Sequence, residues 1–394
     1  MSYKAAMALV KRWRDDPDFI FPSDFADWAL CNPKSKNTIA HELVFVGKPM
    51  PPSFSQWDLR NANEWTVAHL AVVKGLILPS NFYGWHWFND TGASVAHLAA
   101  HHKYPFPENF DRWDLKNYAG ATVAHVAAGA GALPEGFERL DIATNTGWTV
   151  AHEIVAGGHA LPKGFDGWCW SDKFGNTVAH LAACLYTRQR KANPLPASFT
   201  QWGLVNDEGD TVAHMAAKGR HGLPENFDGW AWKNAKGIPV AHIVALKGEL
   251  SESFSDWTIR NEKGETVAHI LVRQGKKLPK AAKAWDWSWR DQDGNTVAHE
   301  AVKNGKKLPR DFSGWGWRNA QGTSVAHLCV EHGQTFSNNP PLEVWQACDA
   351  NGVSVIDLAR KLGRLQAIAQ YEERTIKDAI NPGTTKMPIK RILI

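Results

Sequence analysis

The sequence predicts an α-rich repeat solenoid, in which short stacked helices are joined by turns and extended segments around a tryptophan-rich core. Most spacings between successive copies of one tetrapeptide are 28 residues, with exceptions of 27, 30 and 34. The chain also has 20 Trp against 6 Tyr among 394 residues, so tryptophan has a repeated role. The tetrapeptide is Thr-Val-Ala-His or a near variant, with its histidine at His41, His69, His97, His125, His152, His180, His214, His242, His269, His299 and His327.

Residues 1–20 precede the first copy and predict an N-terminal capping helix. Their apolar stretch is limited to Ala5–Val10 and no cleavage-like site follows, which is atypical of a signal peptide. A repeat array needs such a cap because its terminal repeat otherwise exposes an apolar face.

Each unit of the array, residues 21–353, has two halves. The first starts with a helix-capping Thr such as Thr211, continues through small apolar residues and stops near a Gly, which predicts a helix of two to three turns. The second half predicts a single tight turn of helix at Leu223-Pro224-x-x-Phe227-x-x-Trp230, then an extended Trp-x-Trp piece and an Asn-x-x-Gly turn. So short a helix buries its apolar stripe only against neighbouring copies, so about 11–12 units are expected to stack.

The stretch Gly120-Ala121-Thr122-Val123-Ala124-His125-Val126-Ala127-Ala128 resembles the ankyrin-repeat signature Gly-x-Thr-Pro-Leu-His-x-Ala-Ala. The resemblance covers roughly residues 20–360, with two departures: Val replaces Pro, and the period is about 28 instead of 33. The missing residues fall where ankyrin repeats have their second helix. The resemblance implies a divergent, shortened ankyrin-like array whose concave face binds proteins, and whose box histidine bonds to the Thr of its own box and to the neighbouring backbone.

The 34-residue interval contains an insertion near residues 185–193, including Arg188, Arg190 and Lys191. Insertions in solenoids become loops on one face, often the binding face. These three residues are therefore candidate partner-binding residues, and a tolerated surface loop is the alternative.

Two repeats carry a dilysine in the same place: Lys276 with Lys277, and Lys306 with Lys307. Residues 273–310 contain 10 basic and 4 acidic side chains. Stacking would gather the four lysines into a docking patch for an acidic protein surface, since complementary charge steers encounter. A solvated charged face is the alternative.

The C-terminal segment departs from the repeat. Residues 354–380 show helical periodicity and predict a capping helix, although Ser354-Val355-Ile356-Asp357 also resembles a twelfth, decayed box. Residues 381–394 form a basic and apolar tail.

The repeated histidines invite a metal or catalytic hypothesis, which geometry opposes. Zinc needs ligands within about 2.1 Å, whereas equivalent residues of stacked helices lie about 8–10 Å apart. The expectation is a structural role at the repeated position, here His69, His97, His125, His180, His214, His242, His269 and His327.

The tryptophans could serve as stacking platforms for a ligand. However, the pattern Trp85-x-Trp87 is replaced by Trp113-x-Leu115 and by Leu140-x-Ile142 in other repeats. A position that accepts Trp, Leu or Ile requires buried apolar area, so core packing is expected.

Charge and motifs narrow the function. The net charge of +4 resides in the tail, because residues 1–359 carry 36 basic and 37 acidic side chains. A neutral body opposes a dedicated nucleic-acid binder. Five cysteines without CxxC spacing indicate a reducing, cytoplasmic compartment, and no run of 18 apolar residues suggests a membrane span.

We find no catalytic motif, and expect no enzyme activity, cofactor or metal. The leading hypothesis is a protein-interaction scaffold or inhibitor. Two alternatives remain: a nucleic-acid-binding or nucleic-acid-mimicking protein, and a bacterial effector or phage counter-defence protein that sequesters a target, in a host cell if delivered there.

Overall fold

A computed structural model describes residues 1–184, 195–219, 222–247, 250, 254–275 and 285–380. The chain divides into two compact units. Unit 1 contains Met1–Asp207 together with the segment beginning at Gly219, and unit 2 contains Glu208–Lys218 together with the segment beginning at Gly222.

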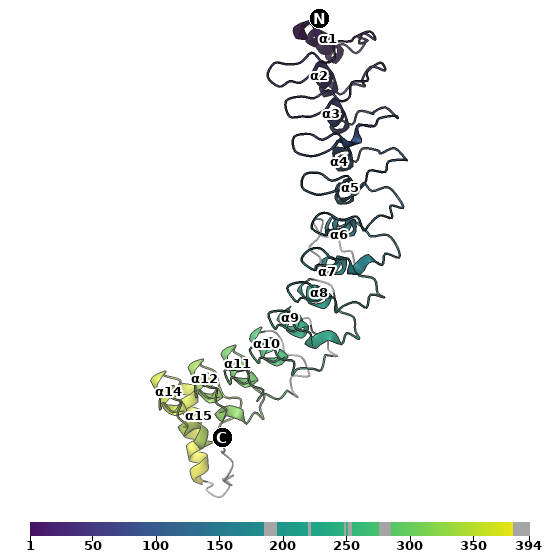
Figure 1. The fold of residues 1–394 in the computed structure, drawn as a ribbon. Helices are drawn as coiled ribbons and strands as arrows, with labels where there is room; N and C mark the ends of the chain where they lie inside the picture. Colours follow the sequence, from purple (N-terminus) through teal and green to yellow (C-terminus); the bar gives the residue numbers. More distant parts are fainter. Residues whose placement is uncertain (185–194, 220–221, 248–249, 251–253, 276–284, 381–394) are drawn as a thin grey trace. The chain divides into compact units, whose positions relative to one another are not determined.

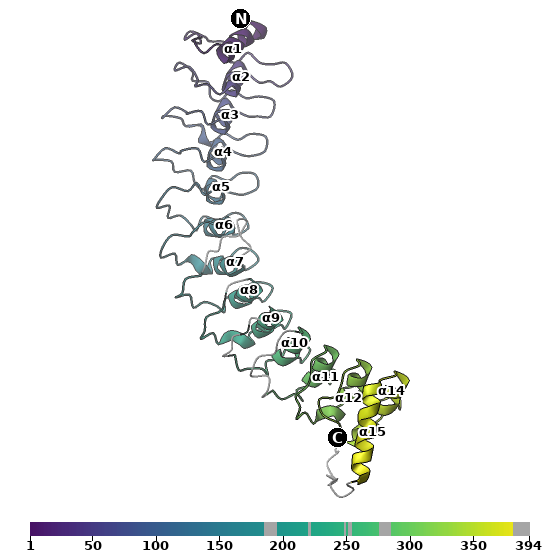
Figure 2. The same cartoon turned by 180° about the vertical axis from the view of Figure 1, so that it is seen from behind.

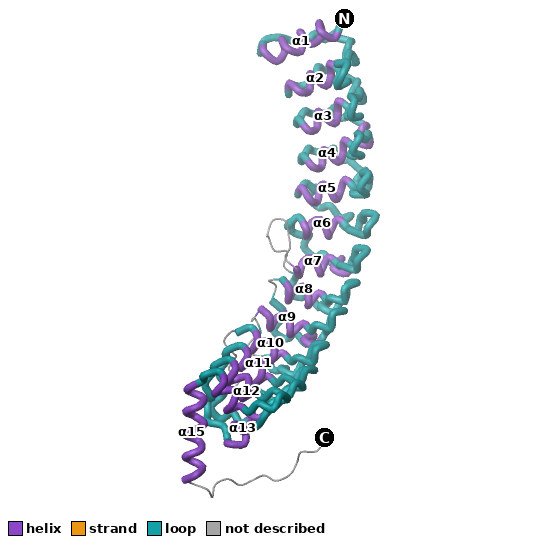
Figure 3. The backbone as a smooth tube through the Cα atoms, turned by 90° about the vertical axis from the view of Figure 1, so that its left-hand side faces the viewer, coloured by secondary structure: helices purple, strands orange, loops and turns teal. Residues whose placement is uncertain are grey.

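Unit 1 is a stack of short helices in which consecutive helices from α1 to α7 lie side by side (Figures 1 and 2). Its turns and loops lie mainly along one side of the helix column (Figure 3). The helices of this unit are α1 (Tyr3–Asp15), α2 (Ile39–Val46), α3 (Val67–Val73), η1 (Gly84–His86), α4 (Val95–His101), α5 (Val123–Ala130), α6 (Val150–Ala156), η2 (Gly167–Cys169) and α7 (Val178–Cys184).

Unit 2 repeats the arrangement and ends differently. Its helices are α8 (Val212–Lys218), η3 (Gly229–Ala231), α9 (Val240–Lys247), α10 (Val267–Arg273), α11 (Val297–Lys303), η5 (Gly314–Gly316), α12 (Val325–Glu331), α13 (Leu342–Gln346), α14 (Val355–Lys361) and α15 (Leu365–Ile380). The last of these packs on α13 and α14.

Most repeat helices begin with the same two-way cap. In α3 the Thr66 hydroxyl accepts from the His69 backbone N–H at 3.3 Å, and the His69 imidazole Nδ1 accepts from the Thr66 backbone N–H at 3.1 Å. This is a capping box with His in the place usually taken by Glu or Gln. Helices of seven or eight residues are unstable alone in water, so the cap and the stacked neighbours together define them.

The segment before each helix is a tight hairpin. Phe88 and Ser94 form one antiparallel bridge, and between them the Asn89 side chain accepts from the backbone N–H of Thr91 and Ala93 at 3.2 and 2.9 Å. Gly92 closes the turn with φ of 74°, a conformation that favours glycine. The predicted extended piece followed by an Asn-x-x-Gly turn is therefore present.

The second half of most repeats contributes a Phe–Trp pair to an aromatic core. A Phe and the Trp three residues later meet edge to face, the geometry that aromatic quadrupoles favour. Ring-centroid distances are 4.6 Å for Phe25–Trp28, 4.9 Å for Phe54–Trp57, 5.0 Å for Phe110–Trp113, 5.2 Å for Phe165–Trp168 and 5.0 Å for Phe312–Trp315. The Trp also reaches the Phe of the following repeat, as in Trp113–Phe137 at 5.2 Å.

Four repeats place a glycine directly before the first tryptophan of Trp-x-Trp. At Gly314, an added Cβ would lie 2.5 Å from Cε3 of Trp317, whose ring covers the glycine. Gly84, Gly167 and Gly229 have the same relationship to Trp87, Trp170 and Trp232. The second tryptophan is half-buried in three of these repeats, and Trp232 remains 38% exposed.

The predicted stacked-helix repeat fold with a tryptophan-rich core is confirmed. The segment 354–380 differs from the expected single capping helix: it contains α14, capped by Ser354 as a twelfth repeat helix, and α15. Gly363, with φ of 64°, separates the two. None of the helices in the described ranges is long and apolar enough to cross a bilayer.

Candidate functional site

The repeated histidines are buried structural links between repeats. Their Nε2 faces a backbone carbonyl oxygen of the following repeat, which can only accept, so Nε2 carries the proton and donates; except in His242, Nδ1 accepts from the helix N-cap residue. These Nε2–O distances are 3.0 Å for His41–Trp65, 3.3 Å for His69–Ala93, 3.1 Å for His97–Ala121, 2.8 Å for His125–Trp148, 3.2 Å for His152–Asn176, 3.0 Å for His214–Ile238, 3.0 Å for His242–Glu265, 3.3 Å for His269–Asn295, 3.2 Å for His299–Thr323 and 3.0 Å for His327–Val353. His180 accepts from Thr177 in the same way, with 3.1 Å between Nδ1 and the backbone N.

Burial keeps these imidazoles neutral. It lowers the pKa of His69 and of His299 to about 4, and it lowers the pKa of His97, His125 and His214 as well. With both nitrogens in hydrogen bonds, a histidine linked in this way offers no lone pair to a metal or substrate. Within the described ranges no three His, Cys, Asp or Glu side chains are placed to share a metal ion.

The structure describes two of the seven basic residues that the sequence offers as candidates for partner binding. Arg188, Arg190, Lys191, Lys276 and Lys277 lie outside the described residues. The ammonium group of Lys306 donates to the carbonyl of Gly275 in the preceding repeat, and Lys307 is exposed. Of the four lysines expected to form a patch, the structure thus shows Lys306 bound to the preceding repeat and Lys307 exposed to solvent.

Other basic side chains near this patch are neutralised by acidic ones. Arg273 donates to Glu265 at 2.5 Å and to Glu300 at 3.3 Å, and Lys303 lies 3.9 Å from Glu300. Both glutamates are only 7% exposed. The excess of positive charge counted over residues 273–310 is therefore smaller at the surface than in the sequence.

A row of aromatic side chains follows five consecutive hairpins of unit 1. We define the aromatic row as Trp65, Phe88, Tyr118, Trp148 and Phe174, one residue in each hairpin. Tyr118 is 76% exposed and Phe174 is 56% exposed, while the other three are half-buried. Aromatic residues are enriched where proteins meet.

Contacts between neighbouring hairpins hold this row together. Arg60 of the first hairpin donates to the Phe88 carbonyl at 2.8 Å, and the Phe88 and Tyr118 rings stack with centroids 6.0 Å apart. Further along, Lys116 donates to the Asn145 side chain at 2.8 Å, and the Lys173 backbone N–H donates to the Thr146 carbonyl at 2.7 Å.

The ring environments in the row are chemically varied. The Trp148 indole donates to Glu153 at 3.0 Å, and the Lys173 ammonium lies 4.9 Å above the Phe174 ring. The row therefore combines flat apolar surface with both signs of charge, which suits recognition of a mixed protein surface.

A second row lies in unit 2. We define the arginine row as Arg260, Arg290 and Arg318, the first residues of three consecutive hairpins. Arg260 Nη1 donates to the carbonyls of Gly264 at 2.5 Å and Arg290 at 2.6 Å; Arg290 Nη1 does the same to Gly294 at 2.8 Å and Arg318 at 2.6 Å. A guanidinium has five N–H donors, so each oriented arginine retains donors for an acidic group.

Sequence reasoning overlooked both rows. For the arginine row the signal was present, since the same hairpin position holds Arg60, Arg260, Arg290 and Arg318. For the aromatic row the signal was weaker, because its members occupy different positions within the hairpin, and the stacking of Phe88 on Tyr118 follows only from the adjacent hairpins.

Comparisons with known proteins add no family. No family model matches the chain, and no curated protein matches it. Among solved structures, the ankyrin repeat domain of Bcl-3 is 18% identical with a TM-score of 0.25, covering 59% of this chain and 87% of that domain. A chain in the structure of the predatory endopeptidase Bd0816 from Bdellovibrio bacteriovorus in complex with the immunity protein Bd3460 is 15% identical with a TM-score of 0.28. The match covers 38% of this chain and 87% of the matched chain.

Proposed function

We propose that the chain is a non-enzymatic protein-interaction scaffold or inhibitor that binds a protein partner through its hairpins. The aromatic row carries this proposal, because five adjacent hairpins present one aromatic side chain each and two of these are largely exposed. Exposed aromatic side chains supply large contact area at low entropic cost, and such residues dominate binding energy at interfaces.

The arginine row adds a charge preference. Three guanidinium groups oriented by backbone carbonyls favour a partner with carboxylates on its surface. Lys306 and Lys307, together with the insertion residues, remain proposed contributors to the same preference. On this proposal the activity is binding itself, in the cytoplasm or, for a delivered effector, in a host cell, where it blocks or sequesters the target.

The hairpin and capped-helix arrangement also supports kinship with ankyrin repeats. In most repeats a Thr or Ser starts the helix through its cap with the His three residues later, and a hairpin precedes it, as the family resemblance implies. We therefore propose a divergent ankyrin-like array in which a Phe-Trp turn replaces the second helix.

The aromatic row is tested by capturing partners from a lysate of the cells that express the chain. We expect the double variant Tyr118→Ala with Phe174→Ala to lose about tenfold or more in affinity for the captured protein, since central aromatics typically contribute at least that much. Tyr83 is 73% exposed but lies outside the hairpins, so Tyr83→Ala is the matched control. Equal capture by both variants would contradict the role of the row.

Nucleic-acid binding is the second candidate, because aromatic rings and arginines also hold single strands. The neutral charge of residues 1–359 opposes it. Measuring single-strand and duplex binding at low and moderate salt separates the two: submicromolar affinity that falls steeply with salt would favour nucleic acid over protein as the partner.

Replacing Lys276, Lys277, Lys306 and Lys307 with Glu is expected to weaken capture of an acidic protein while folding is retained.

A further inference from the structure

One repeat interrupts the aromatic core of unit 1. Every other repeat with a Phe at the turn has a Trp three residues later, whereas Phe137 is followed by Leu140. In the repeat before it, Trp113 lies between Phe110 at 5.0 Å and Phe137 at 5.2 Å. No ring from the Leu140 repeat reaches Phe165 in this way.

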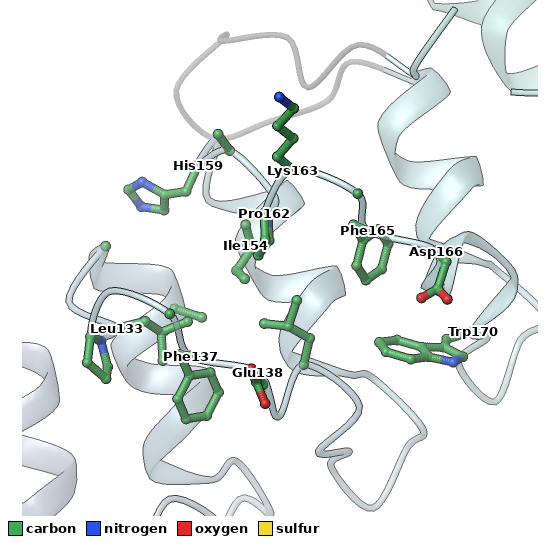
Figure 4. A pocket seen from close by; sticks show the side chains of 17 residues that line it. Leu133, Phe137, Glu138, Ile154, His159, Pro162, Lys163, Phe165, Asp166 and Trp170 are labelled. Carbon is green, nitrogen blue, oxygen red and sulfur yellow. The ribbon is translucent and has the colours of Figure 1, made fainter. Parts of the chain in front are cut away.

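A pocket of about 630 Å³ occupies this place. Figure 4 shows Phe137 on one side of the hollow and Phe165 with Trp170 on the other, and Leu140 and Ile154 also line it. The corresponding groove that Trp113 lines measures about 430 Å³, and the one that Trp85 lines about 230 Å³. Of these three grooves, the one beside Leu140 has the largest volume.

The neighbouring repeat shows which group fits such a space. Its segment Phe110-Asp-Arg-Trp113-Asp-Leu closely matches Phe137-Glu-Arg-Leu140-Asp-Ile. The Trp113 indole N–H donates to the Phe110 carbonyl at 3.1 Å, and Trp202 makes the same bond to Phe199 at 3.0 Å. In the Leu140 repeat the equivalent carbonyl, that of Phe137, has no indole from its own repeat.

The charged side chains around the pocket indicate which groups would accompany an aromatic ring that binds there. Glu138 and Asp166 line it and are exposed, and Lys163 extends away from the rings (Figure 4). An entering aromatic group with an adjacent cation therefore meets carboxylates at the rim.

We propose that this pocket binds a tryptophan side chain of the partner protein, flanked by lysine or arginine. The inference rests on the proposed function and adds a specific anchor to it. The indole would lie between Phe137 and Phe165, as Trp113 lies between Phe110 and Phe137, with its N–H directed to a carbonyl acceptor.

The test uses 19F NMR of a short probe, acetyl-Lys-(5-fluoro-Trp)-Lys-amide, so that the tryptophans of the chain give no signal. We expect the full chain to bind this probe and Leu140→Trp to weaken binding by about tenfold or more, because the introduced indole occupies the same space. Ile77→Trp, at a position 87% exposed, adds a tryptophan outside the pocket and should leave binding unchanged.

A second variant does not alter the apolar lining. Glu138→Lys with Asp166→Lys changes two exposed side chains, and should weaken the cationic probe while the circular dichroism of the chain stays the same. A 4-fluoro-Phe analogue of the probe lacks the indole N–H and should bind several-fold more weakly.

Three results would overturn the proposal. They are no binding of the probe to the unmodified chain, equal binding to the Leu140→Trp variant, and equal binding of the 4-fluoro-Phe analogue or of free 5-fluoroindole. If the pocket fails in this way while Tyr118→Ala with Phe174→Ala still abolishes partner capture, the tryptophan anchor is wrong and the proposed function stands.

Discussion

The imidazole of His69 links two repeats through a single bond: its Nε2 lies 3.3 Å from the carbonyl oxygen of Ala93. The opposite nitrogen accepts from the backbone N–H of Thr66 at 3.1 Å. A backbone amide can only donate, so Nδ1 is unprotonated and the neutral ring satisfies both neighbours. Protonation would replace an acceptor by a donor that faces another donor, inside a site with no exposed surface.

Acid should therefore destabilise the array. Burial lowers the folded-state pKa of His69 and His299 to about 4, below the unfolded value of about 6.5. The unfolded chain binds the proton first, so stability is intact above about pH 6.5, falls as the pH decreases toward 4, and levels off below that. Each of these two histidines contributes about 3 kcal/mol to the loss.

Urea unfolding, followed by circular dichroism at several pH values, measures this effect. The free energy of unfolding should be nearly constant from about pH 8 to 7 and then decline as the pH falls. The slope should correspond to the uptake of several protons per molecule on unfolding, because the other repeated histidines with lowered pKa values also take up protons. A flat profile down to about pH 5 would show that the imidazoles are not buried as neutral rings.

Gly314 and Gly316 provide a matched pair within one 3-10 helix, η5. A Cβ at Gly314 would lie 2.5 Å from the Trp317 ring, whereas a Cβ at Gly316 would meet only a Val344 methyl group at 3.6 Å. Gly314→Ala must displace the ring and should cost about 1–3 kcal/mol. Gly316→Ala should change stability by less than about 0.5 kcal/mol. Thermal unfolding compares the two, and equal effects would rule out the ring as the cause.

Much of the fold could be predicted from the sequence because its causes are local and repeated. In most boxes the Thr or Ser at the start and the His three residues later bond to one another within the same helix turn, so the helix start follows from the tetrapeptide. Asn89 and Gly92 define a hairpin in the same local way. Trp113 could be predicted as a core residue because another repeat has the apolar Leu140 at that position.

The candidate surfaces depend on stacking and were harder to predict. Phe88 and Tyr118 are 30 positions apart and meet only because their hairpins are adjacent. Lysines and arginines near residue 300 count as a basic patch in the sequence, but Glu265 and Glu300 neutralise Arg273 from two different repeats. Leu140 indicated that the tryptophan position accepts other apolar residues. The pocket beside Leu140 could not be predicted, because residues of the neighbouring repeats form part of its lining.

The ion pairs of Arg273 with Glu265 and Glu300 should contribute a pH-dependent part of the stability. Burial raises the pKa of Glu265, but hydrogen bonds from Asn261 and Arg273 outweigh burial and hold that pKa below its ordinary value. Arg273→Met removes a partner from two buried carboxylates and should cost about 1–2 kcal/mol near neutral pH, a figure reduced for the partial exposure of the arginine.

The difference between Arg273→Met and the unmodified chain should shrink as the pH falls below about 4.5, where the unfolded carboxylates take up protons. Arg310→Met changes an exposed arginine and should have little effect. Adding Glu265→Gln to Arg273→Met should recover part of the lost stability. If the Arg273→Met penalty is the same at pH 7 and 3.5, the carboxylates are not its source.

One repeat lacks the cap that the others share, and restoring the cap should stabilise it. Pro239 stands in the Thr position before α9, where it offers neither a hydroxyl nor an N–H. Within the described residues, Nδ1 of the buried His242 consequently has no hydrogen-bond partner, although its Nε2 still donates to the Glu265 carbonyl at 3.0 Å.

Pro239→Thr would supply both donors to Nδ1 and a hydroxyl acceptor for the His242 backbone N–H. The cap and the satisfied nitrogen are worth about 1–3 kcal/mol, partly offset by the greater freedom of the unfolded chain without proline, about 0.4–1 kcal/mol. We expect a net gain of about 1 kcal/mol in urea unfolding. Pro239→Ala restores only the N–H and should gain less, whereas a Pro239→Thr variant less stable than the unmodified chain would mean that the proline, not the missing cap, dominates at this helix start.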